Sequence, residues 1–198
     1  MFMRACMLIV LTVLLTACSL FSPVKTECIK EYRVDVKPYD LKYNHTTFKT
    51  IAVSMPTANR IYQSKQMLYS VRPHELSEFA KNRWAEPPVQ MLQPLIIQAL
   101  QNTHHFKAVA PAISGGRYDL LLNTQVIDFY QDFCESGSVF KLTLRAQMIK
   151  VASGKVVASK QFTVIQPAPR PNPYGGVIAA NIASEKVLNE LAVWAAKY

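Results

Sequence analysis

The second half of this 198-residue chain contains three long runs of strand-forming residues separated by short turns. The runs cover Tyr118–Phe133, Val139–Val151 and Val156–Ile165, with glycine-containing turns at 135–138 and 152–155. Turns this short connect neighbouring antiparallel strands. The first run is apolar on both faces, which is typical of a strand inside a sheet. The sequence therefore predicts an antiparallel meander whose first strand is central.

The second of these runs alternates in polarity. Its even-numbered positions are apolar, whereas Lys141, Thr143, Arg145 and Gln147 occupy the other face. Successive side chains of a strand point to opposite faces of a sheet. We therefore expect one face of the meander to be packed and the other to be wetter.

Two segments have helical periodicity. In residues 87–102, apolar residues recur every three or four positions after Pro87-Pro88, and proline suits the first turn of a helix. Pro94 should bend this helix. A second helix is predicted at about 177–196, after a proline-rich connector at 166–173.

Four further strands are predicted from short apolar or alternating segments at 31–36, 49–55, 66–71 and 106–110. Residues 78–80 fit either a strand or a helical turn. The combination favours an α/β fold: a mixed, largely antiparallel sheet with two main helices packed on it, as an α/β sandwich.

The N-terminal residues have the pattern of a secretory signal peptide. Arg4 precedes an apolar run, Met7–Leu15, which is about half the ~20 residues that a membrane-spanning helix needs. The segment Leu15–Cys18 resembles a bacterial lipobox, which implies cleavage before Cys18 and lipid on that cysteine. Several acyl chains would anchor the protein stably, because each buried methylene adds ~0.8 kcal/mol. An ordinary cleaved signal is the alternative.

This interpretation divides the chain into a signal peptide (1–17), a lipidated tether (18–30) and one domain (31–198). Ser19, rather than aspartate, follows the cysteine. By the sorting rule for such bacteria, that favours the outer membrane, with the domain in the periplasm.

The mature chain is basic. Arg4 leaves with the signal, so 21 of the 22 Lys and Arg residues remain against 13 Asp and Glu residues. Such an excess favours anionic headgroups or an acidic partner. A lipid anchor keeps the domain outside the cytoplasm, which argues against nucleic acid as a partner. The alternative is that the charge serves solubility alone.

Two cysteines remain after Cys6 leaves with the signal and Cys18 takes lipid. In an oxidising compartment, Cys28 and Cys134 would bond if they are close enough, which would stabilise the fold by ~4 kcal/mol. Alternatively, they are two separate thiols.

No catalytic or metal-binding pattern stands out. The sequence lacks a G-x-S-x-G elbow, a P-loop and a G-x-G-x-x-G turn. Neighbouring His104 and His105 would not share a helix face, and no histidine has zinc spacing with the cysteines. Gly175-Gly176 reads as a flexible helix entry rather than an anion site. We therefore expect no enzyme activity and no bound metal.

The segment Arg83-Trp84-Ala85-Glu86-Pro87-Pro88 allows two interpretations. Trp84 could be a core residue with a salt bridge around it. Alternatively, Arg83, Trp84 and Glu86 could bind a partner, because Trp and Arg dominate interaction hot spots.

From about Tyr32 to Trp194, the chain resembles the ABC-type transport auxiliary lipoprotein family. The resemblance rests on motifs that occur in order. They are Thr50–Val53, Met67–Tyr69, Pro73–Leu76 with Phe79, Arg83–Pro88, Met91–Leu95, Phe129–Phe133, Leu144–Gln147 and Tyr174–Val177.

The resemblance implies a non-enzymatic lipoprotein subunit, without a cofactor, of a Mce-type (mammalian cell entry) ABC transport system. Its partners would be a Mce-domain substrate-binding protein, a permease and an ATPase that move phospholipid or another hydrophobic molecule between the inner and outer membranes. Self-association into a homo-oligomer is possible in this family. Cys28 and Cys134 do not belong to the family pattern.

Two other functions compete with this one. The protein could activate a cell-wall synthase or help to assemble an envelope machine, although such proteins usually have a longer tether. It could also carry a lipid itself, which needs a large apolar cavity.

Overall fold

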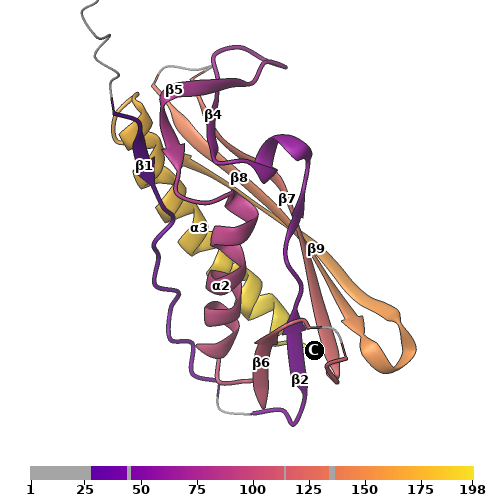
Figure 1. Cartoon of the computed structure of the whole chain (residues 1–198). Helices are drawn as coiled ribbons and strands as arrows, with labels where there is room; N and C mark the ends of the chain where they lie inside the picture. The colour runs from indigo at the N-terminus through magenta and orange to yellow at the C-terminus, as the bar shows by residue number, and fades with distance from the viewer. Residues whose placement is uncertain (1–27, 44–45, 114, 134–136) are drawn as a thin grey trace, which may run out of the picture.

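The computed structural model describes residues 28–43, 46–113, 115–133 and 137–198. Among these residues, nine strands form one mixed sheet, and helices α2 (Pro88–Gln101) and α3 (Pro173–Ala195) pack side by side on it (Figure 1). This arrangement confirms the predicted α/β fold class and both predicted helices.

The meander forms as predicted. It consists of β7 (Leu120–Asp132), β8 (Val139–Lys150) and β9 (Lys155–Pro167), paired antiparallel in that order. A bulge between Val126 and Asp128 shifts the register of β7. Phe129 therefore returns to the buried face that Val126 occupies, whereas the strict alternation expected from the sequence would place it on the opposite face.

The other edge of β7 pairs in parallel with three short strands in succession. These are β2 (Thr50–Val53), β3 (Thr57–Ala58) and β4 (Gln66–Ser70), with the 3₁₀ helix η2 (Arg60–Gln63) between β3 and β4. The central position predicted for residues 118–133 is thereby confirmed.

Three further strands complete the sheet. β5 (Ser77–Trp84) pairs antiparallel with β4, β1 (Lys30–Tyr32) pairs in parallel with β5, and β6 (Ala108–Pro111) pairs in parallel with β2. A short 3₁₀ turn, η3 (Val151–Ser153), joins β8 to β9. Within the described chain, β1, β3, β6 and β9 each pair with one strand and so have an unpaired edge.

The predicted strand at 31–36 was wrong beyond Tyr32. From there the chain runs along α3, where the backbone N–H groups of Asp35 and Tyr39 donate to Oδ1 of Asn181 (2.7 Å) and Asn189 (2.9 Å). The helix side chains satisfy these amides in place of a neighbouring strand.

Residues 82–84 were not predicted as a strand, yet they belong to β5, which runs from Ser77 to Trp84. The helix then begins at Pro88.

Helix α3 begins at Pro173, four residues before the predicted start. Asn172 caps it, because its Oδ1 accepts a hydrogen bond from the Gly175 N–H at 2.8 Å. Gly175 and Gly176 are helical and buried, where a β-carbon would meet the Arg170 carbonyl and the Gln131 side chain, respectively. Close packing, rather than flexibility, explains this glycine pair.

The main core lies between the sheet and the helices. Trp84 and Phe140 from the sheet are almost fully buried there, as are Ala180 and Ala183 of α3. Small residues on α3 allow the helix to approach the sheet closely.

Candidate functional site

The face of the meander that points away from the helices is polar. The register places Asn123, Gln147 and Ser159 in one cross-strand row. Gln125, Arg145 and Gln161 form the next row. The alternation in β8 thus correctly predicted Lys141, Arg145 and Gln147 as wetter residues, whereas Thr143, predicted with them, is 2% exposed.

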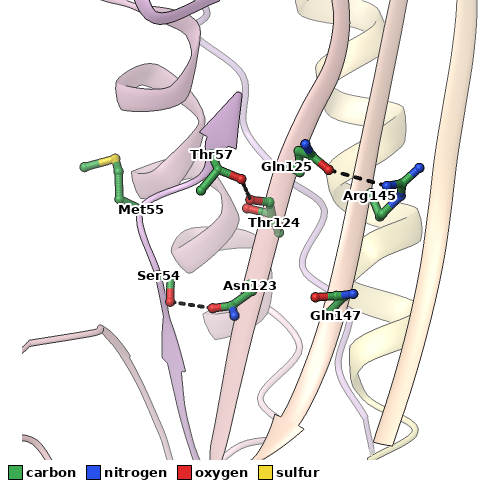
Figure 2. A pocket seen from close by; sticks show the side chains of 8 residues that line it. All are labelled: Ser54, Met55, Thr57, Asn123, Thr124, Gln125, Arg145 and Gln147. Atoms are coloured by element: carbon green, nitrogen blue, oxygen red, sulfur yellow. Dashed lines mark hydrogen bonds between the residues drawn. The ribbon is translucent and has the colours of Figure 1, made fainter. Parts of the chain in front are cut away.

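A hollow of about 470 Å³ lies on this face, where the chain leaving β2 runs beside β7 (Figure 2). We call it the Arg145 hollow. Ser54 Oγ donates to Asn123 Oδ1 at 2.7 Å, and Thr57 Oγ1 donates to the Thr124 carbonyl at 3.3 Å. The lining residues are Ser54, Met55, Thr57, Asn123, Thr124, Gln125, Arg145 and Gln147.

Arg145 is the only charged residue of this lining. Its guanidinium donates to Oε1 of Gln125 at 3.5 Å and to Oε1 of Gln161 at 3.3 Å. Both acceptors are neutral amides, so the positive charge of Arg145 is held in place without being neutralised. A carboxylate or phosphate would form a stronger, charge-assisted pair with it.

This lining suits binding. Hydroxyls, amides and one guanidinium can recognise a polar or anionic group, and the lining contains no His, Cys or carboxylate. Across the described residues, no group of three or more His, Cys, Asp or Glu side chains is placed to hold a metal ion.

A second hollow of about 440 Å³ lies farther along β7. Asp128 pairs with Lys141 at 3.4 Å, and the Lys141 ammonium lies 5.8 Å from the centre of the Tyr130 ring.

The pKa values of three side chains in this region are raised. Partial burial acts to lower the pKa of Lys141, but the Asp128 charge acts in the opposite direction and the pKa is raised. Burial raises the pKa of Tyr130, and burial with the Asp128 charge raises the pKa of Tyr62 to about 12.

The sequence did not single out this group. The bulge in β7 brings Asp128 into register with Thr143, next to Lys141, and bulges leave little trace in a sequence.

Arg83, Trp84 and Glu86 have different environments in the structure. Trp84 is 1% exposed and packs against Phe129 and Phe140, with ring centres 5.4 and 6.5 Å away. Arg83 is exposed and pairs with Glu31, its Nε donating to Oε1 at 2.9 Å, and Glu86 is exposed as well. Of the two interpretations, the geometry of Trp84 matches the core residue with a salt bridge beside it. Arg83 and Glu86 stay accessible to a partner.

The cysteine predictions fall largely outside the described residues. Cys28 is exposed, just before β1, whereas Cys18 and Cys134 both lie outside the described part of the chain. The proposed lipid attachment and disulfide therefore stay predictions.

No helix in the described part of the chain is long and apolar enough to cross a membrane.

Solved structures resemble this fold. Protein XCC0632 from Xanthomonas campestris is 24% identical, with a TM-score of 0.77 over 85% of this chain and 95% of that one. An uncharacterized protein, 11% identical, has a TM-score of 0.68 over 85% of this chain and 99% of its own. At these identities, the likeness shows a shared fold. No curated protein matches the chain significantly.

The sequence itself matches a family model across residues 41–192, from the segment before β2 to the last turns of α3. The match includes α2, most of α3, the whole meander and the residues of the Arg145 hollow. The chain therefore belongs to the family of ABC-type transport auxiliary lipoprotein components.

Proposed function

We propose that this protein is an outer-membrane lipoprotein that serves as a non-enzymatic auxiliary subunit of a Mce-type ABC transporter. The family match over 41–192, which names an auxiliary component of ABC-type transport, carries the proposal. The lipobox-like Leu15–Cys18 and the following Ser19 support lipid anchoring at the outer membrane.

In this proposal, lipid on Cys18 fixes the domain to the membrane and the domain docks a Mce-domain protein. Eleven residues lie between Cys18 and the first residue of β1, Lys30, and this segment spans at most ~40 Å when extended. The domain would thus stay near its membrane. ATP hydrolysis and substrate movement, of phospholipid or another hydrophobic molecule, would belong to the other subunits.

The folded domain fits a docking role. It presents a polar sheet face with an arginine whose charge is not neutralised, together with exposed Arg83 and Glu86. These groups suit protein contacts.

The decisive experiment is to purify the lipidated protein by affinity tag from gently solubilised envelopes and to identify its companions by mass spectrometry. We expect a Mce-domain protein with its permease and ATPase. Recovery of a cell-wall synthase in their place would contradict the proposal and favour an activator of that enzyme.

A further inference from the structure

Strand β9 differs from the other edges of the sheet in length and protection. It has 13 residues, whereas β1 has three, β3 has two, and β6 has four and ends at Pro111. Proteins usually guard edge strands by keeping them short or by placing prolines, bulges or inward charges on them. In β9 the only proline is the last residue, Pro167, and the one register shift lies at its start.

The register shows which backbone groups of β9 point outward. Just beyond the strand, the Ala168 N–H donates to the Ser138 carbonyl at 2.9 Å, and Val139 lies opposite Pro167. Bonded and non-bonded pairs alternate in an antiparallel ladder. The N–H and C=O groups of Ser159, Gln161, Thr163 and Ile165 therefore point away from β8. Within the described chain, no strand other than β8 pairs with β9.

The segment of the chain that forms this edge carries basic residues and no acidic ones. Residues 136–184 contain no Asp or Glu, and the basic residues there are Lys141, Arg145, Lys150, Lys155, Lys160 and Arg170. Of these, only Lys141 has a carboxylate partner among the described residues, namely Asp128. On the helix side, Lys160 shares a hollow with Glu190 of α3. On the other face, the lining around Arg145 contains no carboxylate, so an anionic group there would meet a positive charge that is not neutralised.

Arg145 lies within reach of anything that pairs with β9. Its guanidinium already contacts Gln161, the outward-bonding residue directly opposite it on β9. Strands in a sheet are ~4.8 Å apart, so an added strand would lie ~10 Å from β8. A Glu or Asp on that strand, level with Gln161, could meet Arg145 between them.

We propose that the β9 edge binds an extended, acidic segment of a partner protein, which adds to the sheet as a further strand. Backbone hydrogen bonds to β9 would supply affinity, and acidic side chains facing Arg145, Lys155 or Lys160 would supply selectivity. A second copy of this chain is a poor occupant, because two basic β9 edges would repel each other. Its β1 and β6 edges are too short to match β9.

The inference rests on the proposed function, because it concerns how that complex is held together. The test uses the full lipidated protein in cells. Thr163→Pro removes one outward N–H, and proline is tolerated where that group faces solvent. Thr163→Ala is the matched control, since it loses the same contact with Thr143 (3.3 Å) but keeps the amide.

We expect Thr163→Pro to lower recovery of the partner by about tenfold, while Thr163→Ala stays within about twofold of the parent protein. Thermal unfolding of both variants establishes that they fold. If Thr163→Pro does not fold, the photo-cross-linking below decides alone.

A photo-cross-linking residue at Gln161, with Lys30 on the opposite edge as control, should capture a partner segment with net negative charge. Capture of a second copy, of a basic segment or of nothing would overturn the inference. The two proposals fail separately. A Mce-domain partner that tolerates Thr163→Pro and does not cross-link at Gln161 would refute only the β9 edge. An acidic segment from an unrelated protein would refute only the transporter role.

Discussion

The side chain of Gln131 in β7 packs directly against the α-carbon of Gly176 in α3, leaving no room for a β-carbon. Gln131 is 1% exposed, and its Nε2 donates to Ser138 Oγ at 2.9 Å and to the Asn172 carbonyl at 3.2 Å. This contact joins the central strand to the start of the long helix.

We predict that Gly176→Ala destabilises the protein by about 1–3 kcal/mol, because overpacking outweighs the ~1 kcal/mol that alanine otherwise gains in a helix. Chemical denaturation measures the change. The control is a double-mutant cycle with Gln131→Ala, in which the alanine at 176 should cost less once the glutamine is gone. Additive changes would show that Gln131 is not the obstacle.

Substitutions at Trp84 and at Arg83 should have different effects on the stability of the protein. We predict that Trp84→Ala costs about 3–5 kcal/mol, because it leaves a cavity beside Phe129 and Phe140. Arg83→Ala should cost less than about 1 kcal/mol, because its ion pair with Glu31 is exposed.

The contribution of Arg83 and Glu86 to partner binding can be measured as the recovery of the partner from solubilised envelopes. If Arg83 and Glu86 contact the partner, Arg83→Ala and Glu86→Ala should reduce recovery at unchanged thermal stability. Full recovery with both variants would remove this segment from the docking surface.

Stability should fall at alkaline pH. Burial and the Asp128 charge raise the pKa of Tyr62 from 10.0 to about 12, so the folded state favours the protonated phenol. This contribution is complete below pH 10 and disappears as pH rises to about 12. Denaturant titrations between these pH values should show a smaller decline in Tyr62→Phe. An identical decline in both proteins would contradict the assignment.

Lipidation should depend on one cysteine. We predict that Cys18→Ala abolishes incorporation of radiolabelled palmitate and releases the protein from the membrane fraction, whereas Cys28→Ala leaves both unchanged. Persistent label in Cys18→Ala would refute the lipobox interpretation.

The two other cysteines of the mature chain should form a disulfide. Cys28 lies two residues before β1, where Lys30 is in register with Asn82 of β5. Phe133, the residue before Cys134, packs its ring 6.4 Å from that of Phe79, also in β5. Peptide mapping without reductant should therefore recover a Cys28–Cys134 peptide pair from periplasmic protein. Two alkylatable thiols in the same preparation would count against it.

Much of the fold could be predicted from local patterns in the sequence. Alternation in Val139–Val151 predicted that Arg145 and Gln147 are exposed, although it failed for Thr143. The spacing of Val89, Leu92 and Ile96 predicted α2. Motif resemblance, rather than periodicity, indicated the family. The predicted strand at 31–36 failed because it depended on residues distant in sequence. Asn181 and Asn189 accept hydrogen bonds from the backbone after Tyr32, so this segment does not pair as a strand there.

The candidate site was predictable only in part. The alternation placed Arg145 on the wetter face, but nothing local indicates that Gln125 and Gln161 would bracket it. The sequence itself shows that residues 136–184 contain no Asp or Glu. Only the structure shows that this basic segment includes an edge strand, β9.

The stepwise pairing of β2, β3 and β4 along β7 bears on the export that the predicted signal peptide implies. Ile51 pairs with Leu120, so β2 finds its central partner only after 69 further residues have followed. Contacts this distant slow folding. We expect the nascent chain to stay unfolded, and hence able to thread through a secretion channel, until most of its length has been made.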